Sequence, residues 1–398
     1  MAFTSSNWNL TVVLCIILIS SVVAYRRFIR SKKLPAELKR WLGPVLLPII
    51  GCAHLVPVNY VWKKFEQWSK EYGPIFKIDL LGTDFLVVSD ERIAEELMVK
   101  RAKIYSDRPE MKSLFDSKSS TGTMEYLPLM GRNEFWSRQR KFAYSFYTDS
   151  SNHNYLGSME YEVKRWLNNL IDEPESWSSF LVDMASKIMC QLAWDDPEHS
   201  EYLAKSVWGL LTKMSPGGPI TNVLTPLWDY LPETINPWKY TERRRHDEQN
   251  AWWMLEYLTA RQQNERGQLR QSWVKKFLDS EKPFVAYVFY NTGVAHEVEK
   301  DDYWNGYLIP KGTRILPLDF AILKDKKKYP KGEEFHPERW LEPGWPTFKE
   351  PLTKHPTVVG MSSFGWGRRT CLGQQITQDE LLVACGGQRF QRPVVRYV

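Results

Sequence analysis

SSFGWGRRTCLGQQ, residues 362–375, is the most informative stretch of the chain because it places one cysteine in a fixed pattern of glycine, arginine and aromatic residues. A lone cysteine is ordinarily a small buried hydrophobe. Here a spacing of Phe-x-x-Gly-x-Arg-x-Cys-x-Gly surrounds it, and such a match indicates a ligand role for the sulfur. Glycines within the pattern allow the backbone to turn sharply. The matching residues are Phe364, Gly367, Arg369, Cys371 and Gly373.

This pattern resembles the cysteine-ligand loop of the cytochrome P450 family of haem-thiolate monooxygenases. The resemblance implies a haem (iron protoporphyrin IX) whose iron is bound by the thiolate of Cys371. A helix expected from residue 374 would place this sulfur near the positive end of the helix dipole, which favours a thiolate. The resemblance also implies that Arg369 pairs with a haem propionate and that Phe364 shields the iron–sulfur bond from water.

A second expected contact to the cofactor is the pair Trp136 and Arg140, which lies four residues apart and so on one face of a helix. In the resembled family this helix runs beside the haem, and both side chains contact a propionate. The pair alone is a weak signal, because any basic helix rich in tryptophan could contain it. Its position before the long helical middle is what the resemblance requires.

The amino-acid composition limits which fold classes are possible for this chain. With 398 residues, 43% hydrophobic and 25% charged, the chain can bury a large core, and its 14% aromatic content suits a large apolar cavity. The cysteines are scattered without a CxxC pair, which disfavours a disulfide framework or a zinc ribbon. They are Cys15, Cys52, Cys190, Cys371 and Cys385. The resemblance implies a mainly α fold with a small β-sheet, forming a haem-thiolate domain over residues 52–398.

The N-terminal region predicts one transmembrane helix. Residues 8–25 carry no charge, and the basic stretch RRFIRSKK follows at 26–33. An apolar run of about 18 residues is just long enough to span a bilayer, and the basic flank predicts a cytoplasmic C-terminal end. We expect a luminal segment at 1–7 and an endoplasmic reticulum location. A cleaved signal peptide is the alternative, disfavoured because the basic cluster follows the apolar run. Asn9 begins a formal glycosylation sequon whose use is left open.

Residues 26–51 are expected to form a basic hinge rich in proline and glycine. Gly43, Pro44, Pro48 and Gly51 cannot sit inside a regular helix, so this stretch predicts a rigid, extended connection. It resembles the proline-rich hinge of membrane-bound members of the family.

The next elements follow from periodicity and caps. Residues 61–73 predict an amphipathic helix that stops at Gly73, and residues 74–90 alternate as a two-stranded hairpin. Asp90 is expected to cap the helix that follows. This order resembles the opening of the family, where a small sheet precedes the helical body.

The middle of the chain, residues 161–282, predicts amphipathic helices. By resemblance, this region roofs a cavity for an apolar small-molecule substrate. The net charge of +6 suits a membrane surface or an acidic redox partner, and the resemblance implies an NADPH-cytochrome reductase. Nucleic acid is excluded as a partner because no binding motif is present.

Residues 295–346 carry the second strong resemblance. Gly306 and the Pro-Lys-Gly run at 310–312 punctuate two short strands, and PERW at 337–340 is similar to the family's meander. There Arg339 would join a Glu and an Arg from an ExxR helix in a buried ion triad. The sequence of this region, taken together with that of the cysteine loop, is most similar to fungal members that oxidise secondary metabolites.

Three departures from the family are expected to matter. No ExxR pattern lies between residues 282 and 337, where the family places it. The long central helix with the oxygen-activating signature starts near Ala286-Tyr287 and then breaks off. The final sheet of the family is not found after residue 387. We therefore expect an internally truncated fold in which Arg339 keeps its charge without its buried partners. ExxR occurs only at Glu37, Glu162 and Glu242.

Two hypotheses of function follow. The first is a membrane-anchored haem-thiolate monooxygenase that inserts one atom of O₂ into an apolar small molecule with electrons from the reductase. The second is a catalytically impaired relic that keeps the haem-ligand loop. A zinc hydrolase is a distant third, because none of the seven histidines falls in an HExxH pattern. No motif identifies the substrate or the position oxidised.

Overall fold

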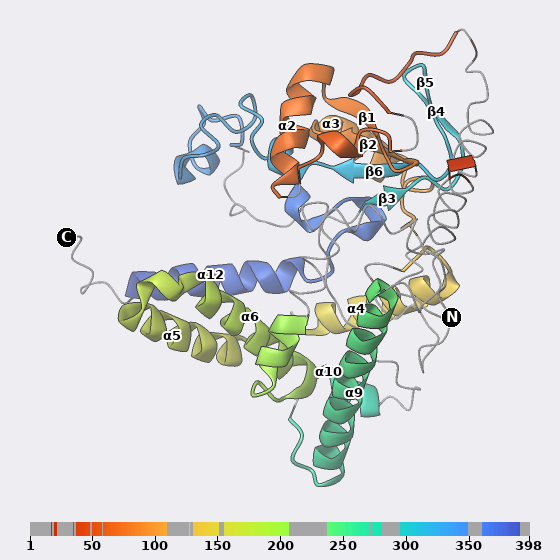
Figure 1. Ribbon diagram of the computed structural model, residues 1–398. Helices are drawn as coiled ribbons and strands as arrows, with labels where there is room; N and C mark the ends of the chain where they lie inside the picture. The colour runs from red at the N-terminus through yellow and green to blue at the C-terminus, as the bar shows by residue number, and fades with distance from the viewer. Residues whose placement is uncertain are drawn as a thin grey trace, which may run out of the picture.

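The structure is a computed structural model of the 398-residue chain (Figure 1). It describes residues 37–47, 50–57, 59–109, 130–150, 155–206, 237–270, 272–279, 295–348 and 360–390, together with the single positions 17, 20, 21, 35 and 127.

A four-stranded sheet with the order β1-β2-β6-β3 forms one part of the molecule. Strands β1 (Ile75–Leu80) and β2 (Thr83–Val88) pair antiparallel, which confirms the predicted hairpin. Strand β6 (Arg314–Pro317) then pairs parallel with β2, and β3 (His296–Glu297) pairs antiparallel with β6. The sheet therefore joins a segment near the start of the chain to one far along it.

Helix α2 (Val61–Tyr72) covers this sheet through an apolar stripe. Val61, Phe65 and Trp68 recur at helical spacing and are buried in one cluster with the strand residues Phe76, Ile78 and Val87. The helix ends at Gly73, whose φ of 104° favours glycine, so the predicted stop is confirmed.

Asp90 caps the next helix as predicted. Its carboxylate accepts hydrogen bonds from the backbone N–H of Arg92 at 2.8 Å and of Ile93 at 3.2 Å. The helix α3 (Glu91–Glu95) continues directly into a π-helical turn, η2 (Glu96–Lys100).

A two-stranded sheet of β4 (Asp302–Trp304) and β5 (Tyr307–Ile309) confirms the short strands expected around Gly306. The backbone N–H of Lys39 donates to the carbonyl of Gly306 at 2.9 Å, and the indole of Trp41 donates to the carbonyl of Leu308 at 3.0 Å. Residues 39–41 are therefore hydrogen-bonded to this hairpin.

The hinge follows β1 closely. The backbone N–H of Lys77 donates to the carbonyl of Leu42 at 2.9 Å, and that of Cys52 donates to the carbonyl of Asp79 at 2.8 Å. The expected connection is thus held by hydrogen bonds to the sheet over its described residues. Pro48 lies outside the described residues.

Helices form the other part of the molecule, in the lower half of Figure 1. Helices are present, as predicted, in the described parts of residues 161–282. The longer helices are α4 (Glu134–Ser150), α5 (Leu156–Asp172), α6 (Trp177–Trp194), α9 (Pro237–Glu265), α10 (Trp273–Asp279) and α12 (Gln374–Phe390). The short helices are η1 (Ala53–Leu55), η4 (Pro174–Ser176), α11 (Asp319–Ile322), η7 (Pro337–Trp340), η8 (Ser362–Phe364) and η9 (Gly367–Arg369).

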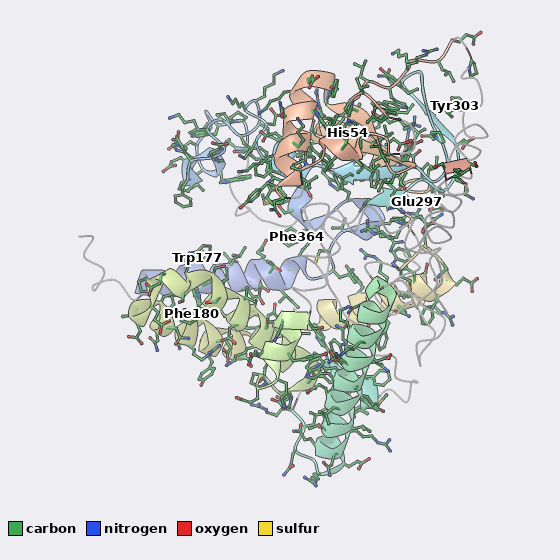
Figure 2. The ribbon with its side chains drawn as sticks, in the orientation of Figure 1. His54, Trp177, Phe180, Glu297, Tyr303 and Phe364 are labelled. Atoms are coloured by element: carbon green, nitrogen blue, oxygen red, sulfur yellow. The ribbon has the colours of Figure 1, made fainter. Side chains whose placement is uncertain are left out.

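Helix α12 lies along α5 and α6 and begins at Gln374, as predicted. Its residues Ile376 and Ala384 are buried with Met159 and Ile188 in one apolar cluster. The cysteine-bearing stretch that precedes α12 lies between this helical part and the sheet, where Phe364 is labelled (Figure 2).

Arg339 has a different environment from the one expected. It is 6% exposed, and its guanidinium donates four hydrogen bonds to backbone carbonyls. The expected ExxR partners are not found among the described helices of residues 295–348, and main-chain oxygens of its own meander accept hydrogen bonds from this buried charge instead. The acceptors are the carbonyls of His336 at 2.9 Å, Pro330 at 3.1 Å, Lys331 at 3.2 Å and Glu334 at 3.2 Å.

Several predictions concern residues that lie wholly or mostly outside the described part of the chain. Of the expected anchor at 8–25, only Ile17, Ser20 and Ser21 are described, and no helix among the described residues is long and apolar enough to cross a membrane. The expected start of the central helix at Ala286-Tyr287 and the end of the chain after residue 390 also lie outside the described residues. Within residues 295–348, no described helix carries an ExxR pattern.

Candidate functional site

The loop that presents Cys371 is closed by its own backbone. The N–H of Cys371 donates to the carbonyl of Phe364 at 2.7 Å, with the short helices η8 and η9 on the path between them. At Gly367, where φ is 55°, an added Cβ would lie 2.1 Å from the carbonyl oxygen of Met98. Only glycine fits there, so this position of the motif is explained by the close approach of η2.

The thiol of Cys371 is largely buried just before α12. Burial raises its pKa, while the backbone N–H of Gly373 and the guanidinium of Arg140 act in the opposite direction. The expected position at the start of a helix is confirmed, but burial outweighs it. A metal ion bound to the sulfur would favour the thiolate against this burial.

Helix α4 brings the predicted pair to this loop. The guanidinium of Arg140 donates to the carbonyl of Thr370 at 2.5 Å, next to the cysteine. Arg369 lies over the ring of Trp136 with its Cζ atom 4.1 Å from the ring centre, and Arg140 lies 5.7 Å from the same centre. The structure thus brings Trp136, Arg140 and Arg369 together beside the loop.

Two further arginines that the sequence analysis missed, Arg108 and Arg132, join this cluster. Arg108 is buried, whereas Arg132 is partly exposed and pairs with Glu299. Burial and the neighbouring Arg108 lower the pKa of Arg369 to about 8, and burial and Arg140 lower the pKa of Arg108 to about 9. Asp107 opposes both shifts without cancelling them. Such crowding of like charge in a buried place is costly unless an anion joins it.

The sequence around Arg108 gave only a weak indication of its role. Arg108 lies in the stretch IYSDRPE at 104–110, which follows the first helices, but a single arginine there is not distinctive. Its guanidinium donates to the carbonyl of Ala295 at 3.0 Å, and Arg369 donates to the carbonyl of Ser106 at 2.7 Å. Segments far apart in the sequence therefore meet at this cluster.

His296, on β3, is the third residue that the sequence analysis missed. It is 2% exposed, and its Nδ1 lies 2.6 Å from the carbonyl oxygen of Tyr105, so Nδ1 carries the proton and donates. Burial, with Arg108 and Arg369 nearby, lowers the pKa of His296 well below its usual value. The imidazole is therefore neutral at pH 7.

These residues fit a haem. A macrocycle with an iron ion and two carboxylate side chains would meet a cysteine sulfur on one part and buried guanidinium groups on another. The arginine cluster is the deciding observation, because the two propionates would offset the burial and mutual repulsion that lower the pKa values of Arg108 and Arg369.

Comparison with known proteins agrees with this geometry. Residues 42–236 and 287–387 match the family described as Cytochrome P450, which is more than half of the chain. The chain belongs to the cytochrome P450 family. As a member, it is of the monooxygenase class of oxidoreductases, and haem is the cofactor of the family. The unmatched stretch, 237–286, contains α9 and α10.

Three curated relatives are fungal. Cytochrome P450 monooxygenase psoD of Aspergillus fumigatus is 26% identical, over 84% of this chain and 80% of its own length. Cytochrome P450 monooxygenase criE of Aspergillus cristatus is 26% identical, over 86% and 76%. The echilunin cytochrome P450 monooxygenase of Aspergillus ruber is 25% identical, over 90% and 78%. These names favour an active monooxygenase over an inactive relic.

The alignment lengths also bear on the internal gap. The first alignment runs over 427 positions but uses 84% of a chain of 398 residues, which is about 334 residues. On the order of ninety positions of that relative therefore have no counterpart within the aligned part of this chain. Their position along the chain is not given by these lengths, so the internal truncation stays a prediction.

The burial of neutral His296 predicts a pH dependence of stability. The unfolded histidine titrates near its ordinary pKa of about 6.5, whereas the folded one titrates lower, so the unfolded state binds the proton first. Stability should be full above about pH 6.5 and fall below it, by at most about 1.4 kcal/mol for each pH unit. Thermal unfolding of the haem-free chain between pH 5 and 8 measures this. His296→Gln should flatten the slope, and the exposed His54→Gln should not. Equal slopes for parent and His296→Gln would contradict it.

Proposed function

We propose that this chain is a membrane-anchored haem-thiolate monooxygenase that inserts one atom of O₂ into an apolar small molecule of a fungal secondary-metabolite pathway. The observation that carries the proposal is the buried arginine cluster beside Cys371, in a chain of the cytochrome P450 family. The relatives' names support the class of reaction, and the substrate class rests on the resemblance.

In this proposal each residue of the site has a defined task. Cys371 binds the iron, and the bound metal ion overcomes the burial that raises the pKa of the thiol. Arg369, Arg140 and Arg108 bind the propionates. Trp136 holds the guanidinium of Arg369 in place by its ring.

The remaining motif residues shape the loop around the sulfur. Phe364 accepts the hydrogen bond that closes the loop, and its ring shields the sulfur from water. Gly367 permits the close approach to η2, and the N–H of Gly373 favours the thiolate. Bound haem supplies the activation of O₂, which no side chain of the protein can perform.

The electron donor is proposed to dock beside the cysteine loop. A surface hollow of about 640 Å³ lies between residues 99–104 and the pair Gly367 and Arg368. Lys100, Lys103 and Arg368 are exposed around it, whereas Arg101 is held by Asp302 at 2.5 Å. A basic surface this close to the metal ligand suits the acidic face of an NADPH-cytochrome reductase.

Reversal of charge at this surface should slow electron delivery. In Lys100→Glu/Lys103→Glu we expect the rate of haem reduction by the reductase to fall about tenfold at low salt, with the difference shrinking at high salt. Stopped-flow reduction under carbon monoxide measures it. The matched control is Lys326→Glu/Lys327→Glu, two exposed lysines on the turn after α11. Equal rates for the two double variants would place the docking surface elsewhere.

The cysteine ligand is tested by the spectrum of the reduced protein with carbon monoxide. The parent chain should give the red-shifted Soret band of a thiolate ligand, and Cys371→Ala should lose it. Cys385→Ala is the matched control, because Cys385 is exposed on α12.

Oxygenation is tested separately. With the reductase, NADPH and ¹⁸O₂, the product should gain one labelled oxygen atom. An unchanged spectrum in Cys371→Ala would refute the ligand, and a thiolate spectrum with peroxide as the sole product would refute the oxygenation.

The anchor is proposed from the sequence at residues 8–25, with residues 1–7 in the lumen and the body on the cytoplasmic face of the endoplasmic reticulum. The uncharged run and the basic stretch at 26–33 support it. Protease added to intact microsomes should digest the body of the chain. Protection of the whole chain until detergent is added would show the opposite orientation, and release into the soluble fraction would refute the anchor.

A further inference from the structure

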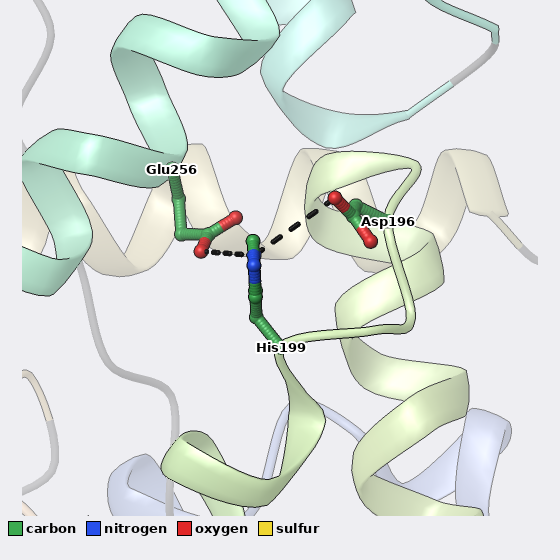
Figure 3. A group of neighbouring side chains, drawn as sticks. All are labelled: Asp196, His199 and Glu256. Carbon is green, nitrogen blue, oxygen red and sulfur yellow. Dashed lines mark ion pairs between the residues drawn. The ribbon is translucent and has the colours of Figure 1, made fainter.

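A cluster of three side chains lies away from the cysteine site, where the turn after α6 meets α9 (Figure 3). Asp196 and His199 belong to this turn, and Glu256 belongs to α9. The family match does not include residues 237–286, so it does not account for Glu256.

The three side chains converge on one point. The Nδ1 atom of His199 lies 2.7 Å from Oε1 of Glu256 and 3.9 Å from Oδ2 of Asp196. One nitrogen thus faces both carboxylates, and the three candidate donor atoms all lie within 4.8 Å of one another. Figure 3 shows both carboxylates directed at the same edge of the imidazole ring.

Glu256 is the residue that most needs a cation. It is 2% exposed, and its Oε1 atom faces Nδ1 of His199, which is its ion-pair partner among the described residues. Burial raises its pKa, and Asp196 raises it further, whereas His199 opposes the shift. A buried carboxylate beside a second carboxylate is stabilised by a divalent positive charge.

The negative charge of the cluster also reaches its surroundings. Cys190, buried on α6, has its pKa raised to about 12 by burial and then by Glu256 and Asp196. The thiol of Cys190 is not one of the three convergent donor groups. His199 is half-exposed, which leaves the cluster open to solvent on one side. An ion can enter there, and a water molecule can complete its coordination.

We propose that Asp196, His199 and Glu256 bind a divalent transition-metal ion, with zinc as the ion that their donor atoms suit best. One imidazole nitrogen and two carboxylate oxygens disfavour calcium and magnesium, which prefer oxygen alone. Three protein ligands and one water give the tetrahedral set that zinc accepts. Metal ligands bind in their deprotonated forms, so binding of the ion weakens in acid.

The site would fasten α9 to the end of α6. The described contacts between these helices already include the rings of Trp194 and Trp253, whose centres lie 5.5 Å apart. A bound ion adds a second connection that depends on the ion's concentration, because a ligand that binds only the folded state stabilises it. The inference does not rest on the proposed oxygenation.

A second histidine provides a matched control. His336 also lies between two carboxylates, with Nε2 2.9 Å from Glu334 and Nδ1 3.9 Å from Glu338. Its two nitrogens face different carboxylates, so the three groups cannot converge on one ion. The comparison of the two histidines therefore separates a metal site from an ordinary ion pair.

The experiment uses the untagged, haem-loaded full chain and zinc chloride alone. Zinc content after dialysis and zinc affinity by titration calorimetry are measured for the parent, His199→Ala, Glu256→Gln and His336→Ala. We expect one zinc ion per chain in the parent and in His336→Ala, and at least about tenfold weaker binding in the other two. Zinc should raise the unfolding temperature of the parent by a few degrees and leave that of His199→Ala unchanged.

Two results would overturn the site. The first is a parent chain that binds no zinc, which would leave only an ion pair between His199 and Glu256. The second is undiminished affinity in His199→Ala, which would place the zinc elsewhere. If the buried Glu256→Gln does not fold, Asp196→Asn on the turn tests the same carboxylate requirement, and its full retention of zinc counts against the site.

Discussion

The structure depends on how it accommodates buried positive charge around the cysteine loop. Arg369 is held by the carbonyl of Ser106 and the ring of Trp136, Arg140 by the carbonyl of Thr370, and Arg108 by that of Ala295. Burial and mutual repulsion lower the pKa values of Arg369 and Arg108, and Asp107 offsets these shifts only in part. The loop, α4 and the sheet therefore meet at buried arginines that an anion would stabilise. Binding of the cofactor's carboxylates would thus also stabilise the packing of these elements.

Local elements could be predicted from the sequence because short-range physics determines them. The stripe of Val61, Phe65 and Trp68, the cap at Asp90 and the start of α12 each follow from neighbours within a few residues. The cysteine loop could be found because its spacing is rare. Arg108 and His296 could not, because each is a single common residue whose role arises only when distant segments pack together.

Arg339 shows where reasoning from the family alone is misleading. The expectation of an orphaned charge assumed that only an ExxR helix could satisfy this guanidinium. The meander instead turns back on itself and offers four carbonyls, which are neutral acceptors present whatever lies elsewhere in the chain. A hydrogen bond from a charged donor to a backbone carbonyl stabilises without a carboxylate partner.

The parallel pairing of β2 with β6 has a consequence for synthesis. Residues 85–88 of β2 cannot pair with residues 314–317 of β6 until most of the chain has left the ribosome. Helix α5 likewise cannot pack against α12 before then. Contacts between such distant segments form late and slowly because long loops must close first. During that interval the hairpin of β1 and β2 exposes an unpaired edge, which is the kind of surface that chaperones recognise and that aggregates when left bare.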